Sequence, residues 1–251
     1  MRIQYACVCS CGLVRKSNQD NLVWEKKFLP QDHDGLPAPV IAETGLDRRI
    51  LFGVFDGIGG EPRGDMAAFI AAKTAVESEI PGSREELAHL CFRANRAICE
   101  YAQRNKLSAC GTTAAMLLLE QGKVSGCNVG DSRIYRYRND ALIQLSEDHV
   151  FPVYTRIKPP LLQYLGIPEN EMLIEPYFFE DALYPDDLYI ICSDGLTDML
   201  ADGQIRHILM ETPSVREQAE SLLSAVLAAG GRDNVTFILV RIQDRNEEPG
   251  N

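Results

Sequence analysis

The sequence has few of the features that mark nucleic-acid-binding or membrane proteins. Acidic residues outnumber basic ones, 36 to 25, which gives a formal net charge of −11, and no basic cluster occurs. This balance argues against a nucleic-acid or anionic-membrane surface, because both need basic patches. No apolar run approaches the roughly 18 residues that span a membrane. The first residues, "MRIQYACVCSCG", make a poor signal peptide because Gln4 and Ser10 interrupt the apolar run. We expect a cytoplasmic protein.

Several catalytic and metal-binding signatures are also missing. There is no G-x-x-x-x-G-K-[ST] loop for a nucleotide and no G-x-S-x-G turn for a serine nucleophile. The eight cysteines, which we expect to be reduced, include no C-x-x-C pair. Cys7, Cys9 and Cys11 alternate as on one face of a strand, and we interpret them as core residues rather than as a thiolate metal site. Among the four histidines, His149 in "SEDHV" is interpreted as a turn or hydrogen-bonding residue.

The apolar patterns predict one α+β domain over residues 1–243 and a polar tail over 244–251. Strands are expected at 2–11, 22–25, 51–55, repeatedly between 110 and 145, near 173–179, at 187–193 and at 234–242. Residues 29–48 are expected to form a loop. One helical pair follows the third strand, with a first stripe of Met66, Phe69, Ile70 and Ile80. A second pair precedes the last strand, and its apolar residues are Ile205, Ile208 and Leu209 in one helix and Ala219, Leu222, Leu223, Val226 and Leu227 in the other. Because antiparallel hairpins alternate with these pairs, we predict an α-β-β-α sandwich of two antiparallel sheets flanked by helical pairs.

Aspartates stand at the ends of the predicted strands. In "LFGVFDGIGGE" an apolar strand runs into Asp56 and then Gly57, and "YIICSDGLTD" does the same with Asp194, followed by Asp198. The other three are Asp20 in "RKSNQDN", Asp131 in "CNVGDSR" and Asp233 in "GGRDNVTFILV". A sheet can bring such strand ends together. Carboxylates held close repel one another unless cations or protons bind.

Oxygen ligands of this kind favour Mg²⁺ or Mn²⁺ over zinc or copper. A glycine after the ligand leaves its carbonyl accessible, and Gly57 is therefore a candidate ligand too. Two or three divalent ions held by aspartates indicate activation of water for attack on a phosphoryl group. Arg15, on the turn before Asp20, is placed to bind the substrate phosphate through its fork of donors. Alone, each motif is also compatible with an ordinary turn.

Seven motifs, in this order, resemble the metal-dependent PP2C (PPM) family of serine/threonine protein phosphatases, in its bacterial form. They are "VRKSNQD", "VFDGIGG", "GTTAAMLL", "NVGDSRIY", "SEDHV", "ICSDGLTDML" and "GGRDNVTFILV". The resemblance runs nearly from end to end. It implies the sandwich described above, with metal ions in a cleft at one end of the two sheets, and hydrolysis of phosphoserine or phosphothreonine by direct attack of metal-activated water.

The resemblance also implies roles for individual residues. Asp56 would bridge two Mn²⁺ or Mg²⁺ ions, and the Gly57 carbonyl would bind one of them. Asp194 and Asp233 would complete the shell of the first ion, with Asp20 supporting the pair directly or through water. A third, weaker ion would take Asp131 and Asp198 together with Asp194. Arg15 matches the family's phosphate-binding arginine, so that Arg15 and Asp56 are the predicted catalytic residues.

Three positions depart from the family pattern. Ile58 stands where eukaryotic members carry a histidine proposed as general acid, and Gln19 replaces a common acidic residue. The segment after His149 lacks the usual longer flap pattern. Two alternatives stay open: a pseudophosphatase that binds phosphoproteins without hydrolysis, and a phosphatase of a sigma-factor regulator in a partner-switching system. We expect a monomer whose partners are phosphoserine or phosphothreonine proteins and a cognate kinase.

Overall fold

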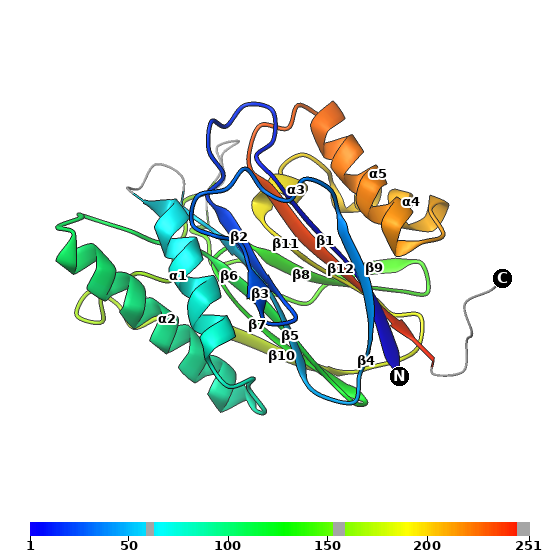
Figure 1. Ribbon diagram of the computed structural model, residues 1–251, viewed down its shortest axis with the longest axis horizontal. Helices are drawn as coiled ribbons and strands as arrows, with labels where there is room; N and C mark the ends of the chain where they lie inside the picture. Colours follow the sequence, from blue (N-terminus) through cyan, green and yellow to red (C-terminus); the bar gives the residue numbers. More distant parts are fainter. Residues whose placement is uncertain (59–62, 153–158, 245–251) are drawn as a thin grey trace.

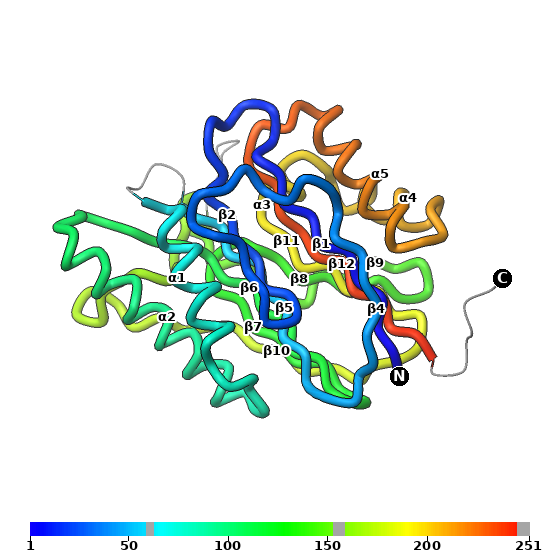
Figure 2. Tube along the Cα trace, viewed as in Figure 1, coloured from blue at the N-terminus to red at the C-terminus, as the bar shows by residue number. Residues whose placement is uncertain are grey.

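Two antiparallel sheets of six strands each lie face to face in the computed structural model, which describes residues 1–58, 63–152 and 159–244. The first sheet contains, in spatial order, β4 (Val40–Gly45), β1 (Arg2–Ser10), β12 (Val235–Gln243), β11 (Leu188–Cys192), β8 (Arg133–Arg138) and β9 (Ala141–Gln144). The second contains β10 (Tyr177–Ala182), β7 (Lys123–Val129), β6 (Ala114–Glu120), β5 (Ile50–Asp56), β2 (Asp20–Trp24) and β3 (Lys27–Phe28). Figure 2 shows β1 and β12, from opposite ends of the chain, side by side in the first sheet.

Helices cover the outer face of each sheet. The pair α1 (Gly64–Glu77) and α2 (Arg84–Arg104) packs on the second sheet, and the pair α4 (Asp202–Glu211) and α5 (Val215–Ala228) packs on the first (Figure 1). A single helical turn, α3 (Asp194–Thr197), follows β11. The predicted α-β-β-α sandwich is confirmed. Within the described ranges, none of the helices has the length and apolar character needed to cross a bilayer.

The alternation of side chains in the central strands explains why the layers form. In β5, Phe52 and Val54 face the core between the sheets, whereas Leu51 and Phe55 face the helices α1 and α2. Since both faces of this strand are covered, every position from 50 to 55 is buried. The strand is thus anchored on both sides up to Asp56, its last residue, and the position of that carboxylate is fixed by the packing of the strand behind it.

Local signals in the sequence account for several helix boundaries. Ser83 caps α2 by accepting a hydrogen bond from the backbone N–H of Glu86 at 3.3 Å, and the Glu86 carboxylate accepts from the backbone N–H of Gly82. Ser214 and Glu217 form a full reciprocal capping box at the start of α5. Both helices therefore begin where the capping spacing predicts.

Four sequence predictions need correction. The segment 29–48, predicted to be a loop, contains β4, an edge strand paired with β1. Prolines near this strand and its half-buried side chains give it a sequence pattern typical of a loop. The strand expected near 173–179 lies at Tyr177–Ala182, and α3 was not expected. The buried face of α1 consists of alanines, while Met66, Phe69 and Ile70 are half-buried and Ile80 follows the helix. Alanines occupy the buried face because their small side chains let α1 approach the sheet closely. Most of the predicted tail, 245–251, lies outside the described residues.

Candidate metal centre

The aspartates predicted from strand ends lie at one end of the two sheets. Asp56 ends β5 and Asp20 begins β2, and the two residues are direct partners in the antiparallel ladder. Asp194 begins α3 just after β11, and Asp233 lies two residues before β12. A cleft of about 310 Å³ opens there, lined by Arg15, Gln19, Asp56, Gly57, Ile58, Thr113, Asp131, Pro159, Pro160, Leu161, Asp194, Asp198, Asp233 and Asn234.

Asp20 lies behind the cleft and is only 2% exposed. Its Oδ2 accepts a hydrogen bond from the Ser193 hydroxyl at 3.0 Å, and that hydroxyl in turn accepts from the backbone N–H of Thr236 at 3.0 Å. Its Oδ1 has no hydrogen-bond partner. Burial raises the pKa of Asp20, and the nearby charge of Asp233 raises it further, while side-chain contacts with Thr236, Ser193 and Asp56 oppose the shift. A buried carboxylate oxygen without a partner is a position for a proton or a cation.

The backbone of Asp56 is held by a pair of threonines. Its carbonyl accepts from the Thr112 hydroxyl and from the Thr113 backbone N–H, both at 2.8 Å. Its N–H donates to Thr113 Oγ1 at 3.1 Å, and this oxygen also shares a hydrogen bond of 2.6 Å with the Ser132 hydroxyl. The backbone therefore cannot move, and the Asp56 side chain reaches the cleft from a rigid base.

Gly57 is required at its position by close approach of neighbouring backbone. A Cβ atom built there would collide with the carbonyl oxygens of Gly64 and Gln19. The Gly57 N–H donates to the Gln19 carbonyl at 3.1 Å, and the next N–H, of Ile58, donates to the Gly111 carbonyl at 3.0 Å. The glycine thus lets β5, β2 and the start of α1 meet directly behind the cleft.

Arg15 reaches the cleft from the loop between β1 and β2. Its Nη2 donates to Asp233 Oδ2 at 2.7 Å. The Asn234 side chain holds this loop through three hydrogen bonds. Its Nδ2 donates to the carbonyls of Cys11 at 3.1 Å and Ser17 at 3.0 Å, and its Oδ1 accepts from the Gln19 N–H at 2.8 Å. Asn234 is 5% exposed. The buried Asn234 side chain thereby joins the loop that carries Arg15 to the segment that carries Asp233.

Asp131 and Asp198 line the same cleft. Asp131 follows Gly130, which exchanges two hydrogen bonds with His149: the Gly130 N–H donates to His149 Nδ1 at 3.2 Å, and the His149 N–H donates to the Gly130 carbonyl at 3.0 Å. His149 is therefore a hydrogen-bonding residue of a turn, as predicted. The N–H of Asp198 donates to the Asp194 carbonyl at 2.7 Å, so α3 sets the spacing of these two carboxylates.

The donor set fits hard divalent cations. Every predicted ligand offers oxygen, and Asp20 Oδ1 is a buried acceptor that lacks a partner. Among the described residues, however, no three His, Cys, Asp or Glu side chains are already close enough to hold an ion. The carboxylates share a cleft, but those of the described residues do not form a finished coordination shell.

Sequence reasoning assigned no role to four residues that shape this site. Thr113, Ser193 and Asn234 each stand inside a quoted motif, and Ser193 and Asn234 directly adjoin a predicted ligand, but only the three-dimensional contacts show what they hold in place. His33 gave no signal at all. It lies in the segment interpreted as a loop, and its Nε2 is 3.0 Å from the Asp20 carbonyl oxygen. Burial lowers the pKa of His33.

The three departures from the family pattern also fall at the cleft. Ile58 and Gln19 both line it. The flap segment returns along it through Pro159, Pro160 and Leu161, and it is tied to the body of the protein by backbone bonds between Thr112 and Leu165. The centre of the flap, residues 153–158, lies outside the described residues.

Comparisons with known proteins agree with this geometry. The family model described as "Protein phosphatase 2C" matches residues 8–151. The serine/threonine phosphatase stp of Listeria innocua is 30% identical over 254 residues, which cover 91% of this chain and 92% of that protein.

Solved structures of phosphatases share the fold. The structure of the Mycobacterium tuberculosis serine/threonine phosphatase PstP/Ppp aligns with a TM-score of 0.78 at 24% identity, covering 97% of this chain and 100% of that one. A structure of the catalytic domain of PstP in complex with two manganese ions aligns with a TM-score of 0.75 at 25% identity and the same coverage.

Proposed function

The chain belongs to the protein phosphatase 2C family, and from that premise we propose which residues of this metal-dependent protein phosphatase carry each part of the reaction. The substrate is phosphoserine or phosphothreonine in a protein, and the products are the hydroxyl side chain and inorganic phosphate. The observation that carries the proposal is the convergence of Asp56, Asp131, Asp194, Asp198 and Asp233 on one cleft.

Two ions of Mn²⁺ or Mg²⁺ would be held by Asp56, the carbonyl of Gly57, Asp194 and Asp233, with Asp20 beneath them. A third, weaker ion would take Asp131 and Asp198. When bound, such ions lower the pKa of water and neutralise the charge of the phosphoryl group. The orphaned Oδ1 of Asp20 and the all-oxygen donor set support this assignment.

Arg15 binds and orients the phosphate. Its guanidinium has five donors, of which the contact with Asp233 uses one, so the others can form paired hydrogen bonds to phosphate oxygens. A phosphate dianion would be repelled by a cleft of bare carboxylates. Arg15, which the loop between β1 and β2 places at the rim, supplies the positive charge that this chain itself contributes.

Hydrolysis proceeds without a covalent phosphoenzyme. Within the described part of the cleft lining, Thr113 is the one hydroxyl side chain, and its oxygen is taken up by the Asp56 N–H and by Ser132. The aspartates of the lining would be engaged as ligands of the ions, so, as in the family that the chain belongs to, water activated by those ions is the proposed nucleophile. Ile58 has no proton to give to the leaving serine or threonine oxygen, so that proton also comes from water.

The state of the cysteines bears on the cellular compartment of the enzyme. All eight cysteines are free thiols, which supports a reducing, cytoplasmic compartment. We propose a monomeric single domain over residues 1–243 that opposes a serine/threonine kinase. The alternative of a binding module without activity predicts the loss of a core ligand, and Asp56, Asp194 and Asp233 are all present.

The test is phosphate release from a phosphothreonine peptide, with Mn²⁺ or with EDTA, by wild type and by Asp56→Asn in parallel. We expect turnover that needs Mn²⁺ and is abolished in the variant. Asp47→Asn, the same change at an exposed position that precedes β5 and does not line the cleft, is the control. Near-wild-type turnover by a folded Asp56→Asn variant would refute the ligand assignment, and the absence of any turnover by wild type would refute the enzyme.

A further inference from the structure

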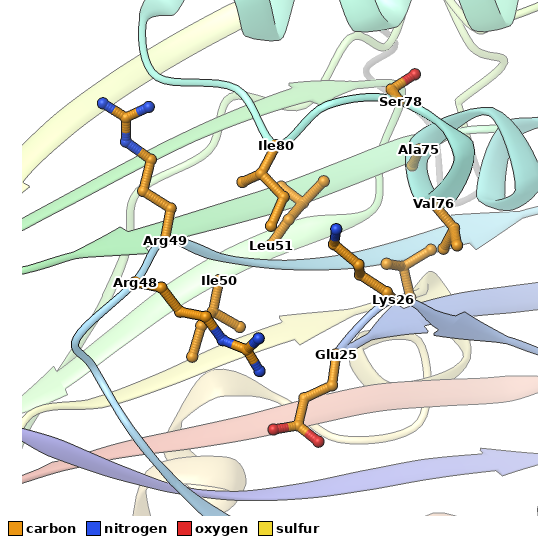
Figure 3. A pocket seen from close by; sticks show the side chains of 11 residues that line it. Glu25, Lys26, Arg48, Arg49, Ile50, Leu51, Ala75, Val76, Ser78 and Ile80 are labelled. Atoms are coloured by element: carbon orange, nitrogen blue, oxygen red, sulfur yellow. The ribbon is translucent and has the colours of Figure 1, made fainter.

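A second cavity lies at the other end of the second sheet, away from the candidate metal centre. Three connections surround it: the β2–β3 turn, the β4–β5 turn and the segment between α1 and α2 (Figure 3). We call it the far-end pocket. Val23 lies three residues beyond Asp20 and Leu51 five residues before Asp56, so strand rise places it roughly 10–17 Å from those carboxylates. A ligand bound here would not enter the cleft.

The floor of the far-end pocket is apolar. Val23, Ile50, Leu51 and Ala75 are buried beneath it, and Ile80 forms part of its wall. Its volume is about 80 Å³. An apolar cavity of about 150 Å³ takes a benzene ring, so a pocket of about half that volume suits one branched aliphatic side chain.

The rim of the far-end pocket is positively charged. Figure 3 shows Lys26 reaching across the pocket from one turn, with Arg48 coming from another. Both are exposed, and neither has an ion pair with any residue that the structure describes. Arg49 is different, because its Nε donates to Glu120 Oε2 at 3.3 Å and its guanidinium lies over Gly82.

Glu25, the one acidic side chain that lines the pocket, forms no ion pair with Lys26 or Arg48 in the part of the chain that the structure describes. Glu25 carries its carboxylate away from Lys26 in Figure 3. It contacts the Tyr5 hydroxyl instead, where it adds to the effect of burial in raising the pKa of Tyr5. The backbone fixes the arrangement, since Glu25 and Lys26 both have positive φ, 44° and 62°, as in a tight hairpin turn. Two unpaired cations therefore border an apolar hollow on a chain of net charge −11.

We propose that the far-end pocket binds an acidic segment of a partner protein, in which one leucine, isoleucine or valine enters the hollow and flanking carboxylates pair with Lys26 and Arg48. A free inorganic anion would leave the apolar floor unused. An anionic membrane surface needs a broad basic patch, and in the described residues only two unpaired cations, Lys26 and Arg48, border this pocket. An acidic peptide with an aliphatic anchor satisfies both parts of the site. The proposal does not depend on the phosphatase reaction.

The test measures binding of a fluorescein-labelled peptide with one leucine between two pairs of glutamates, by anisotropy at low salt. Wild-type protein is compared with the double variant Lys26→Gln, Arg48→Gln. The control, Arg96→Gln with Lys106→Gln, makes the same change of charge outside the pocket, and Lys106, like Lys26, has positive φ. A second peptide carries serine in place of the leucine.

We expect saturable binding to wild type and to the control, weakened about tenfold by the double variant and about tenfold by the serine peptide. Binding should also weaken as salt is added. The Asp56→Asn variant should bind as wild type does. Absence of saturable binding, equal binding by the serine peptide, or equal binding by the double variant would each overturn the proposal. Competition by inorganic phosphate alone, at the concentration of the peptide, would show a simple anion site and would overturn it too.

Discussion

The buried carboxylate of Asp20 should have opposite effects on stability without and with metal. It is 2% exposed, and Oδ1 has no hydrogen-bond partner. Leaving a buried acceptor unsatisfied costs about 1–3 kcal/mol, and more for a charged group. In EDTA at neutral pH we therefore expect Asp20→Asn, which removes the charge and keeps the shape, to leave the free energy of unfolding unchanged or to raise it by up to about 3 kcal/mol.

The pH dependence of stability has the same origin. Because burial raises the pKa of Asp20 in the folded protein, the folded state holds a proton at pH values where the unfolded state has lost it. In EDTA, the contribution of Asp20 to the free energy of unfolding of wild type should thus be fully present below the ordinary carboxyl pKa. It should be lost as the pH rises through the raised pKa of the folded state. Asp20→Asn should lack this component of the fall.

Urea unfolding and thermal melts, each in EDTA and in Mn²⁺, measure both effects. For a chain of this size, 1 kcal/mol corresponds to about 2–4 °C in Tm. At 100 times its Kd, an ion that binds only the folded state adds about 2.7 kcal/mol, and we expect the variant to gain much less of this than wild type. The exposed control Asp47→Asn should behave as wild type. The reasoning fails if Asp20→Asn is clearly less stable than wild type in EDTA, or if it gains as much from Mn²⁺.

Three further substitutions test the remaining parts of the site. Arg15→Ala should raise KM for a phosphopeptide more than it lowers kcat, and Arg15→Lys should recover part of the loss; an unchanged KM would remove Arg15 from phosphate binding. Asp131→Ala should weaken a third Mn²⁺ in calorimetric titrations and leave the two tighter ions nearly unchanged, so equal weakening of all three would contradict its assignment. Gly57→Ala should cost about 1–3 kcal/mol or more in urea unfolding, because its Cβ meets the Gly64 and Gln19 carbonyls; a wild-type midpoint would contradict the close approach.

The sequence predicted the layers of the fold well, for reasons that can be read in particular elements. The apolar run of β5 is buried from Ile50 to Phe55, and the residues at helical spacing in α2, from Leu87 to Ile98, form its one buried face, so the period of each pattern corresponds directly to the structure. The hairpin at Asn139 and Asp140 carries two residues with positive φ, as its composition suggests.

Where prediction failed, burial was partial or the side chains were small. The strand β4 is half-buried at the edge of its sheet, and prolines stand near it, so its pattern resembles a loop. In α1 the larger apolar residues suggested the buried face, but Ala68, Ala72 and the other alanines occupy it. Close packing on a sheet selects for small volume there, and a hydrophobicity pattern does not record volume.

The candidate site divides in the same way. The sequence alone determined that Asp56, Asp194 and Asp233 stand at strand ends close to glycines, because strand termini and glycine turns are local features of the chain. Only the tertiary structure decided that Asp20 is buried with an unpartnered oxygen, and that Ser193, Thr113, Asn234 and His33 hold the segments around it. Those contacts join residues up to 223 positions apart. Hydrogen-bond partners at such separations depend on how the strands pair and how the two sheets pack on each other. No local pattern in the sequence specifies this packing.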